Sequence, residues 1–125
     1  VNESISEAKH KEIEATFAKA HIASYEQQLG SSNFNKELYG NGPVTRPGVK
    51  YTIIEGRYDD TVVPFTNAFL HEPGVKNILV QDTCRNDHAS HVNFTYDVNV
   101  YQMAVNALDP DHAQPVTCVP QPFIG

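Results

Sequence analysis

Two short apolar runs, each closed by a polar or turn-forming stretch, constrain this sequence most. Residues 50–56 read KYTIIEG and residues 77–81 read NILVQ, and neither run alternates polar with apolar side chains. Such runs are typical of strands in a sheet that is covered on both faces. Segments of helical character, residues 64–70 and 97–108, follow the two runs. Strands that alternate with helices through short turns predict an α/β fold with a parallel sheet, although two strands do not complete a doubly wound sheet.

The first 48 residues predict helices and turns, so we treat them as a helical cap or lid-like segment separate from residues 49–125. Residues 4–29 contain no Pro or Gly and are rich in good helix formers. Ser4 and Glu7 have the spacing of a capping box, and Gly30 can end the helix. The apolar side chains approximate one stripe, which fits ordinary core packing and a lid over an acyl pocket equally well. The stripe consists of Ile13, Phe17, Ile22, Tyr25 and Leu29.

Glycine and proline divide the remainder of the chain. Residues 30–48 are rich in Ser, Asn, Gly and Pro, which predicts a short helical turn near 34–38 and then an irregular connector. Residues 97–108 place apolar side chains at helical spacing, and Asp109-Pro110 ends that helix. Four prolines after it predict an extended tail. The helical apolar set is Val98, Tyr101, Val105 and Leu108.

Composition excludes some classes of function. The chain has 15 acidic and 9 basic residues, a net charge of −6, and no long Lys/Arg block, whereas a nucleic-acid partner requires a clustered basic face. No stretch approaches the roughly 18 consecutive apolar residues of a membrane span. The N-terminus lacks the pattern of a signal peptide, so we expect no membrane span and, if the protein is exported, a mature chain.

Two cysteines favour an oxidising, secreted setting. Cys84 and Cys118 occur in a small chain beside two N-glycosylation acceptors, at Asn2 and Asn93. Each acceptor motif is weak alone, but together these features predict a single disulfide and an extracellular location. A Cys84–Cys118 bridge would attach the tail to the loop after the second run.

Polar residues follow both predicted strands, where catalytic groups gather in parallel sheets. Asp59 and Asp60 come soon after the first run, and His91 lies in the loop after the second. This is the chain order of the acid and the histidine in the Ser, acid, His triad of α/β-hydrolases. In such triads the histidine is the general base, and a buried carboxylate fixes its tautomer. Asp59 and His91 are therefore the candidate catalytic residues.

Each of these residues also has a simpler interpretation. Asp59 and Asp60 could be turn residues with self-satisfied side chains, and only one of them can face His91; we favour Asp59. His88 and His91 form an H-x-x-H with Asp87, but a catalytic zinc requires three protein ligands, so we expect no metal and no cofactor. The remaining histidines are interpreted as surface residues without partners. They are His10, His21, His71 and His112.

A longer pattern surrounds the two candidates. The stretch YTIIEGRYDDTVVPF, followed by NAFL, NILVQDTC, HASHV and NALDPDHAQPVTCV, resembles the C-terminal half of the secreted class 2 lipases and esterases. These α/β-hydrolases are known chiefly from actinobacteria and also occur in fungi. The resemblance covers about residues 23–120 and is strong only after residue 49. It implies that Asp59 is the triad acid, that His91 is the triad base, and that Cys84 and Cys118 form the family's disulfide.

The nucleophile of that family has no counterpart in this sequence. The family uses a serine in G-x-S-x-G, and neither this pentapeptide nor the oxyanion loop occurs in the 125 residues. Ser31 and Ser32 follow a predicted helix, and Ser90 lies inside the histidine loop. We expect part of a triacylglycerol lipase or carboxylesterase, acting on an ester or lipid, inactive alone and completed by a chain or segment that carries the serine. The alternative is a non-catalytic secreted piece with a structural or recognition role.

Overall fold

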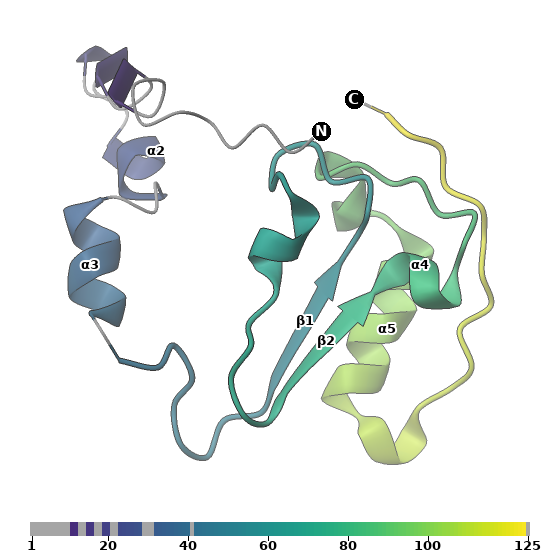
Figure 1. Cartoon of the computed structure of the whole chain (residues 1–125). Coiled ribbons are helices and arrows are strands. Elements are labelled where there is room, and N and C mark those ends of the chain that lie inside the picture. The colour runs from purple at the N-terminus through teal and green to yellow at the C-terminus, as the bar shows by residue number, and fades with distance from the viewer. Residues whose placement is uncertain are drawn as a thin grey trace. The chain divides into compact units, whose positions relative to one another are not determined.

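The computed structural model describes residues 11–12, 15–16, 19–20, 23–28, 32–40 and 42–124. The chain divides into two compact units, residues 1–46 and 47–125, and each is described by itself (Figure 1).

The first unit contains helices α2 (Ala23–Gln28) and α3 (Asn33–Tyr39). Ser32 caps α3, because its hydroxyl oxygen accepts the Asn35 N–H at 3.1 Å. Gly40 ends it at a φ of 57°, a conformation that favours glycine. The helical turn predicted near residues 34–38 is confirmed.

The helix predicted over residues 4–29 includes α2. Residues 11, 12, 15, 16 and 19 of the same segment are also helical. The Ser4–Glu7 pair, Gly30 and four of the five stripe residues lie outside the described residues, and Tyr25 is exposed. The choice between core packing and a lid therefore stays a prediction.

The second unit contains a parallel sheet of two strands, β1 (Tyr51–Glu55) and β2 (Val75–Leu79), in which Glu55 pairs with Leu79. The first predicted strand and the mixed α/β class are confirmed. The second strand lies two residues earlier than predicted, because Val80 and Gln81 belong to a helical turn, α4 (Val80–Thr83). Val80 is fully buried, so its apolar character reflects core packing rather than strand pairing.

The expected coverage of both sheet faces is not found in the described part of the chain. Lys76 and Asn77 of β2 are exposed, and four of the five residues of β1 are only partly buried. The small core consists of Val80, Cys84 and Met103, so the two strands contact only a limited apolar layer. The side chains packed against this core are Ile54, Ile78, Phe94, Val100 and Val116.

Short helices connect these elements. The segment predicted as a short helix over residues 64–70 contains a 3₁₀ helix, η1 (Phe65–Ala68). Helix α5 (Val98–Leu108) confirms the helix predicted over residues 97–108, and it begins where the Asp97 carboxylate accepts the Asn99 N–H at 2.8 Å. Two further 3₁₀ turns, η2 (Val92–Thr95) and η3 (Pro110–His112), flank α5.

The C-terminal tail is extended, as predicted, and lies along α5 (Figure 1). Two asparagines of α5 bind its backbone in the same manner: Asn99 pairs with the N–H and C=O of Val119, and Asn106 with those of Gln114, at 2.7–2.9 Å. Because the two asparagines are seven positions apart, they lie on one face of the helix. The predicted Cys84–Cys118 disulfide is also present. Asparagine amides and a covalent bond thus hold the tail.

Among the helices that the structure describes, none has both the length and the apolar character needed to cross a membrane.

Candidate active site

Asp59 lies in the loop that leaves the carboxyl end of β1. Its Oδ1 accepts the N–H groups of Thr61 and Val62 at 2.8 and 2.7 Å, which is the turn-residue behaviour considered from the sequence. This arrangement uses one carboxylate oxygen and leaves Oδ2 for another donor. The side chain is only 4% exposed, so the turn places an ionisable group in a sheltered position.

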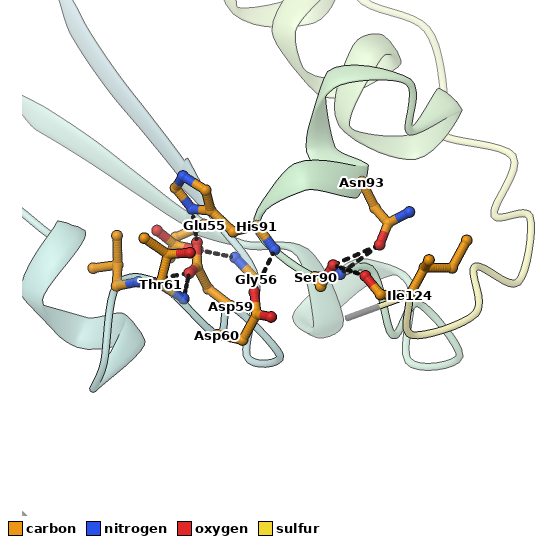
Figure 2. A network of polar contacts seen from close by, with 10 residues as sticks. Glu55, Gly56, Asp59, Asp60, Thr61, Ser90, His91, Asn93 and Ile124 are labelled. Atoms are coloured by element: carbon orange, nitrogen blue, oxygen red, sulfur yellow. Dashed lines mark hydrogen bonds and ion pairs between the residues drawn. The ribbon is translucent and has the colours of Figure 1, made fainter.

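His91 meets that second oxygen. Its Nδ1 lies 2.7 Å from Asp59 Oδ2, a contact that joins loops 32 residues apart in the sequence (Figure 2). This confirms the predicted contact between Asp59 and His91, whereas their catalytic role stays a prediction. The His91 side chain is 46% exposed, and its Nε2 has no hydrogen bond with any residue in the described part of the chain. The imidazole is therefore anchored on one nitrogen and accessible on the other.

Asp60 supports the same histidine through the backbone. Its Oδ1 accepts the main-chain N–H of His91 at 3.2 Å (Figure 2). The tandem acids thus have different partners: Asp59 binds the imidazole and Asp60 binds the peptide group. This fits the prediction that only one of them faces the ring.

The hydrogen bonds of Asp59 determine its charge state. Burial alone would raise the pKa of the Asp59 carboxyl, but the hydrogen bonds from His91, Val62 and Thr61 outweigh it, so the pKa lies below its ordinary value. Asp59 is thereby kept as a carboxylate, which is the form that accepts a hydrogen bond from the Nδ1–H of an imidazole.

Glu55, at the end of β1, is a neighbour that the sequence reasoning missed. It is 5% exposed, and its Oε1 accepts the Gly56 N–H at 2.7 Å. Burial raises the pKa of Glu55, the Gly56 N–H opposes this, and the adjacent Asp59 raises it further. The available signal was an acidic residue at the end of an apolar strand, four positions before Asp59.

Gln81 links the acid loop to the histidine loop. It is buried, its Oε1 accepts the Arg57 N–H and its Nε2 donates to the Asp87 carbonyl, both at 2.8 Å. One side chain of α4 therefore fixes the distance between the segments that carry Asp59 and His91. Gln81 is thus helical, although the apolar run 77–81 predicts a strand there.

Two buried acids, Asp87 and Asp97, lie at the base of the loop that carries His91. Asp87 Oδ1 accepts the Ala89 N–H at 3.0 Å, and its Oδ2 accepts an N–H of the Asn99 amide at 2.8 Å. Asp97, the N-cap of α5, is 2% exposed; burial raises its pKa, the Asn99 N–H opposes this, and Asp87 raises it further. The loop that carries His91 is thus held at its base by hydrogen bonds within the chain.

Ser90 directly precedes His91 but faces another network. It is buried, and its hydroxyl contacts Asn93 Oδ1 and the Ile124 carbonyl rather than the imidazole (Figure 2). A nucleophile must lie within hydrogen-bond reach of its base. Ser90 therefore does not complete a triad in this geometry, and Ser31 lies outside the described residues.

The other histidines form no metal site. His88 is exposed, with its ring 4.5 Å from that of Tyr58, and no group of three His, Cys, Asp or Glu side chains able to hold a metal occurs in the described part. His71 is exposed as expected. The expectation that His112 has no partner is wrong, because η3 brings Asp109 within 3.0 Å of its Nδ1. His10 and His21 lie outside the described residues.

A polar cavity of about 360 Å³ lies beside the acid loop, lined by Arg57, Tyr58, Gln81, Asp82 and Arg85. Its lining is mostly charged or amide-bearing, whereas an acyl chain requires apolar walls. This cavity therefore does not supply an acyl pocket.

Comparison with known proteins found no family model that matches the chain and no significant match among curated proteins.

Proposed function

We propose that this chain supplies the acid and the base of a Ser-His-Asp carboxylic-ester hydrolase, as the C-terminal portion of a lipase or esterase with an α/β-hydrolase fold. The observation that carries the proposal is the Asp59–His91 pair, with a 2.7 Å contact on Nδ1 and an accessible Nε2. A sheltered carboxylate on one nitrogen and open space at the other is the arrangement that a triad base requires. The sequence resemblance to secreted class 2 lipases and esterases points to the same two residues.

The proposed reaction is acyl transfer through a serine outside these 125 residues. As the serine oxygen bonds to the ester carbonyl carbon, His91 Nε2 accepts the hydroxyl proton, and it then returns that proton to the departing alcohol. Water next repeats the sequence: it gives a proton to Nε2, attacks the acyl carbon, and the carboxylic acid leaves as the serine regains its proton. Asp59 keeps Nδ1 protonated and stabilises the imidazolium at each stage.

Secretion is part of the same proposal. The disulfide between Cys84 and Cys118 favours an oxidising compartment. Asn93 of the second acceptor motif accepts from Ser90 through its Oδ1, which leaves the amide nitrogen for a glycan. The substrate class would be carboxylic esters, including lipid esters.

The test combines activity with identification of the nucleophile. The protein is purified from its native source without reduction, treated with a fluorophosphonate probe that labels activated serines, and assayed on a short p-nitrophenyl ester. We expect a labelled serine on a co-purifying segment or chain, and loss of both labelling and turnover in His91→Ala. Turnover that persists in His91→Ala would exclude His91 as the general base, and a native preparation with neither labelling nor turnover would favour the non-catalytic alternative.

A further inference from the structure

Two of the three arginines in the sequence line the same polar cavity. Its volume is about 360 Å³, and Arg57 and Arg85 form the lining together with Tyr58, Gln81 and Asp82. Arg57 follows β1, and Arg85 follows α4, which continues directly from β2 (Figure 1). Because β1 and β2 are parallel, both arginines lie beyond the same edge of the sheet, which is where ligands bind in parallel α/β folds.

Contacts within the fold anchor both arginines. The Arg57 main chain donates its N–H to Gln81 Oε1 at 2.8 Å, and the Arg57 guanidinium lies 5.9 Å from the centre of the Phe65 ring. A cation–π contact of this kind restrains the side chain and leaves its N–H groups available to a ligand. Arg85 directly follows Cys84, which is buried and belongs to the disulfide. The two cations are therefore carried by backbone segments that the fold holds in place.

The cavity lining is positively charged, although the chain has a net charge of −6. The lining has two arginines and one aspartate, Asp82, for a formal charge of +1. Within the described part of the chain, neither guanidinium forms an ion pair. A further cavity lined by Arg85, of about 250 Å³, has the buried Asp87 in place of a second cation. The larger cavity is therefore the better site for an anion.

We propose that this cavity binds the carboxylate group of a small organic acid, with Arg57 and Arg85 as the binding cations. A guanidinium presents paired N–H donors that match the two oxygens of a carboxylate. The lining charge of +1 fits a monoanion, whereas a phosphate dianion would place uncompensated negative charge beside Asp82. The volume lies within the range of about 300–1,000 Å³ that is usual for small-molecule sites. This site goes beyond the ester-hydrolase proposal, because it uses neither His91 nor a serine.

Benzoate and its neutral analogue benzamide test the site, because they have nearly the same shape and differ in charge. Binding is followed in the whole disulfide-bonded chain by ¹⁵N NMR of the arginine Nε–H groups at constant ionic strength. We expect benzoate to shift the signals of Arg57 and Arg85 with one saturable dissociation constant, in the millimolar range because both side chains are exposed to water. Benzamide should shift neither signal. Arg46 lies outside the cavity and donates to the Pro43 carbonyl, so its signal should stay unchanged.

Substitutions of the lining should change the affinity in opposite directions. Arg57→Gln and Arg85→Gln should each weaken benzoate binding at least about fivefold, because each removes a charge-assisted hydrogen bond. Asp82→Asn should strengthen binding, because it removes a negative charge from the lining. Arg46→Gln is the matched control: it removes the same charge from an exposed arginine of the first unit and should leave the dissociation constant unchanged.

The wild-type titrations can overturn the inference without any variant. Equal shifts of all three arginines that do not saturate would show general screening, and benzamide binding as tight as that of benzoate would remove the role of charge. Inorganic phosphate is the competing anion, and tighter binding of phosphate than of benzoate would overturn the assignment to a carboxylate. Among the variants, an Arg57→Gln or Arg85→Gln protein that folds and binds benzoate as tightly as the wild type would also overturn the inference.

Discussion

Truncation of Asn99 tests how the tail is held, because Asn106 offers the same chemistry in a different environment. Asn99 is fully buried; its amide donates to Asp87 Oδ2 at 2.8 Å and to the Val119 carbonyl at 2.7 Å, and its Oδ1 accepts the Val119 N–H at 2.8 Å. Asn106 makes the same pair of bonds to Gln114 in a partly exposed position, where its Oδ1 also accepts an N–H of the Gln102 amide at 2.9 Å. A neutral hydrogen bond contributes about 1 kcal/mol net, and a bond to a charged group about 1.5–3 kcal/mol. Asn99→Ala should therefore lower the free energy of unfolding by about 3–5 kcal/mol, and Asn106→Ala by less than about 1 kcal/mol.

Urea denaturation of the disulfide-bonded proteins provides the measurement. Both substitutions replace asparagine with alanine in α5, so the gain in helix propensity is similar and largely cancels in the comparison. With typical urea slopes of about 1–3 kcal/mol/M, the Asn99→Ala midpoint should fall by at least about 0.7 M relative to Asn106→Ala. Equal midpoints for the two variants would show that burial does not strengthen the Asn99 contacts, and the reasoning would fail.

Three further predictions follow from the site and the disulfide. Asp59→Asn should place an amide N–H against Nδ1 of His91, which shifts the ring proton to Nε2 and lowers kcat by about 10⁴, whereas Asp60→Asn should change kcat little. Ring ¹⁵N NMR and steady-state kinetics distinguish the two variants, and equal losses of kcat would contradict the assignment of Asp59. Replacing Cys84 and Cys118 by serine removes the disulfide that joins residues 34 positions apart. In chemical denaturation the free energy of unfolding should fall by about 4 kcal/mol, and a decrease below about 1 kcal/mol would be too small for the loop-closure model. Because the pKa of Asp59 is lowered on folding, its contribution to stability is present above its ordinary pKa and is lost as the pH falls through the lowered value. The acid limb of stability against pH should therefore flatten in Asp59→Asn, and an unchanged limb would show that folding does not lower this pKa.

The parts of the fold that sequence predicted are those with local signals. Strand β1 is a β-branched run that ends at glycine, and α5 begins at Asp97 and ends before Asp109-Pro110. The boundary of β2 was misplaced because a buried apolar run has no periodicity that separates a strand from a helical turn. Val80 is buried in either case, so its side chain carries no information about the boundary.

The contact between Asp59 and His91 was predictable from the sequence, whereas the contributions of their neighbours were not. Asp59 and His91 follow successive parallel strands, and the carboxyl ends of such strands lie at one edge, so chain order alone brings them together. The burial of Glu55 at the end of β1 depends on the packing of the folded chain, and the bridge through Gln81 depends on the place where β2 ends. These are tertiary contacts, and no spacing of residues in the sequence predicts them.

The contacts that hold the acid and the base all come from one unit of the chain. The Asp59–His91 bond, the Asp60 contact with the His91 backbone and the bridge through Gln81 join residues after β1 to residues after β2, and none requires a further strand. Under the proposed function, this acid–base pair has its geometry before the serine is supplied, so completing the triad would orient one additional group rather than three. Preorganisation of this kind reduces the entropy lost when the site forms. The contact between Asp59 and His91 can therefore be tested by NMR of the whole chain independently of catalysis.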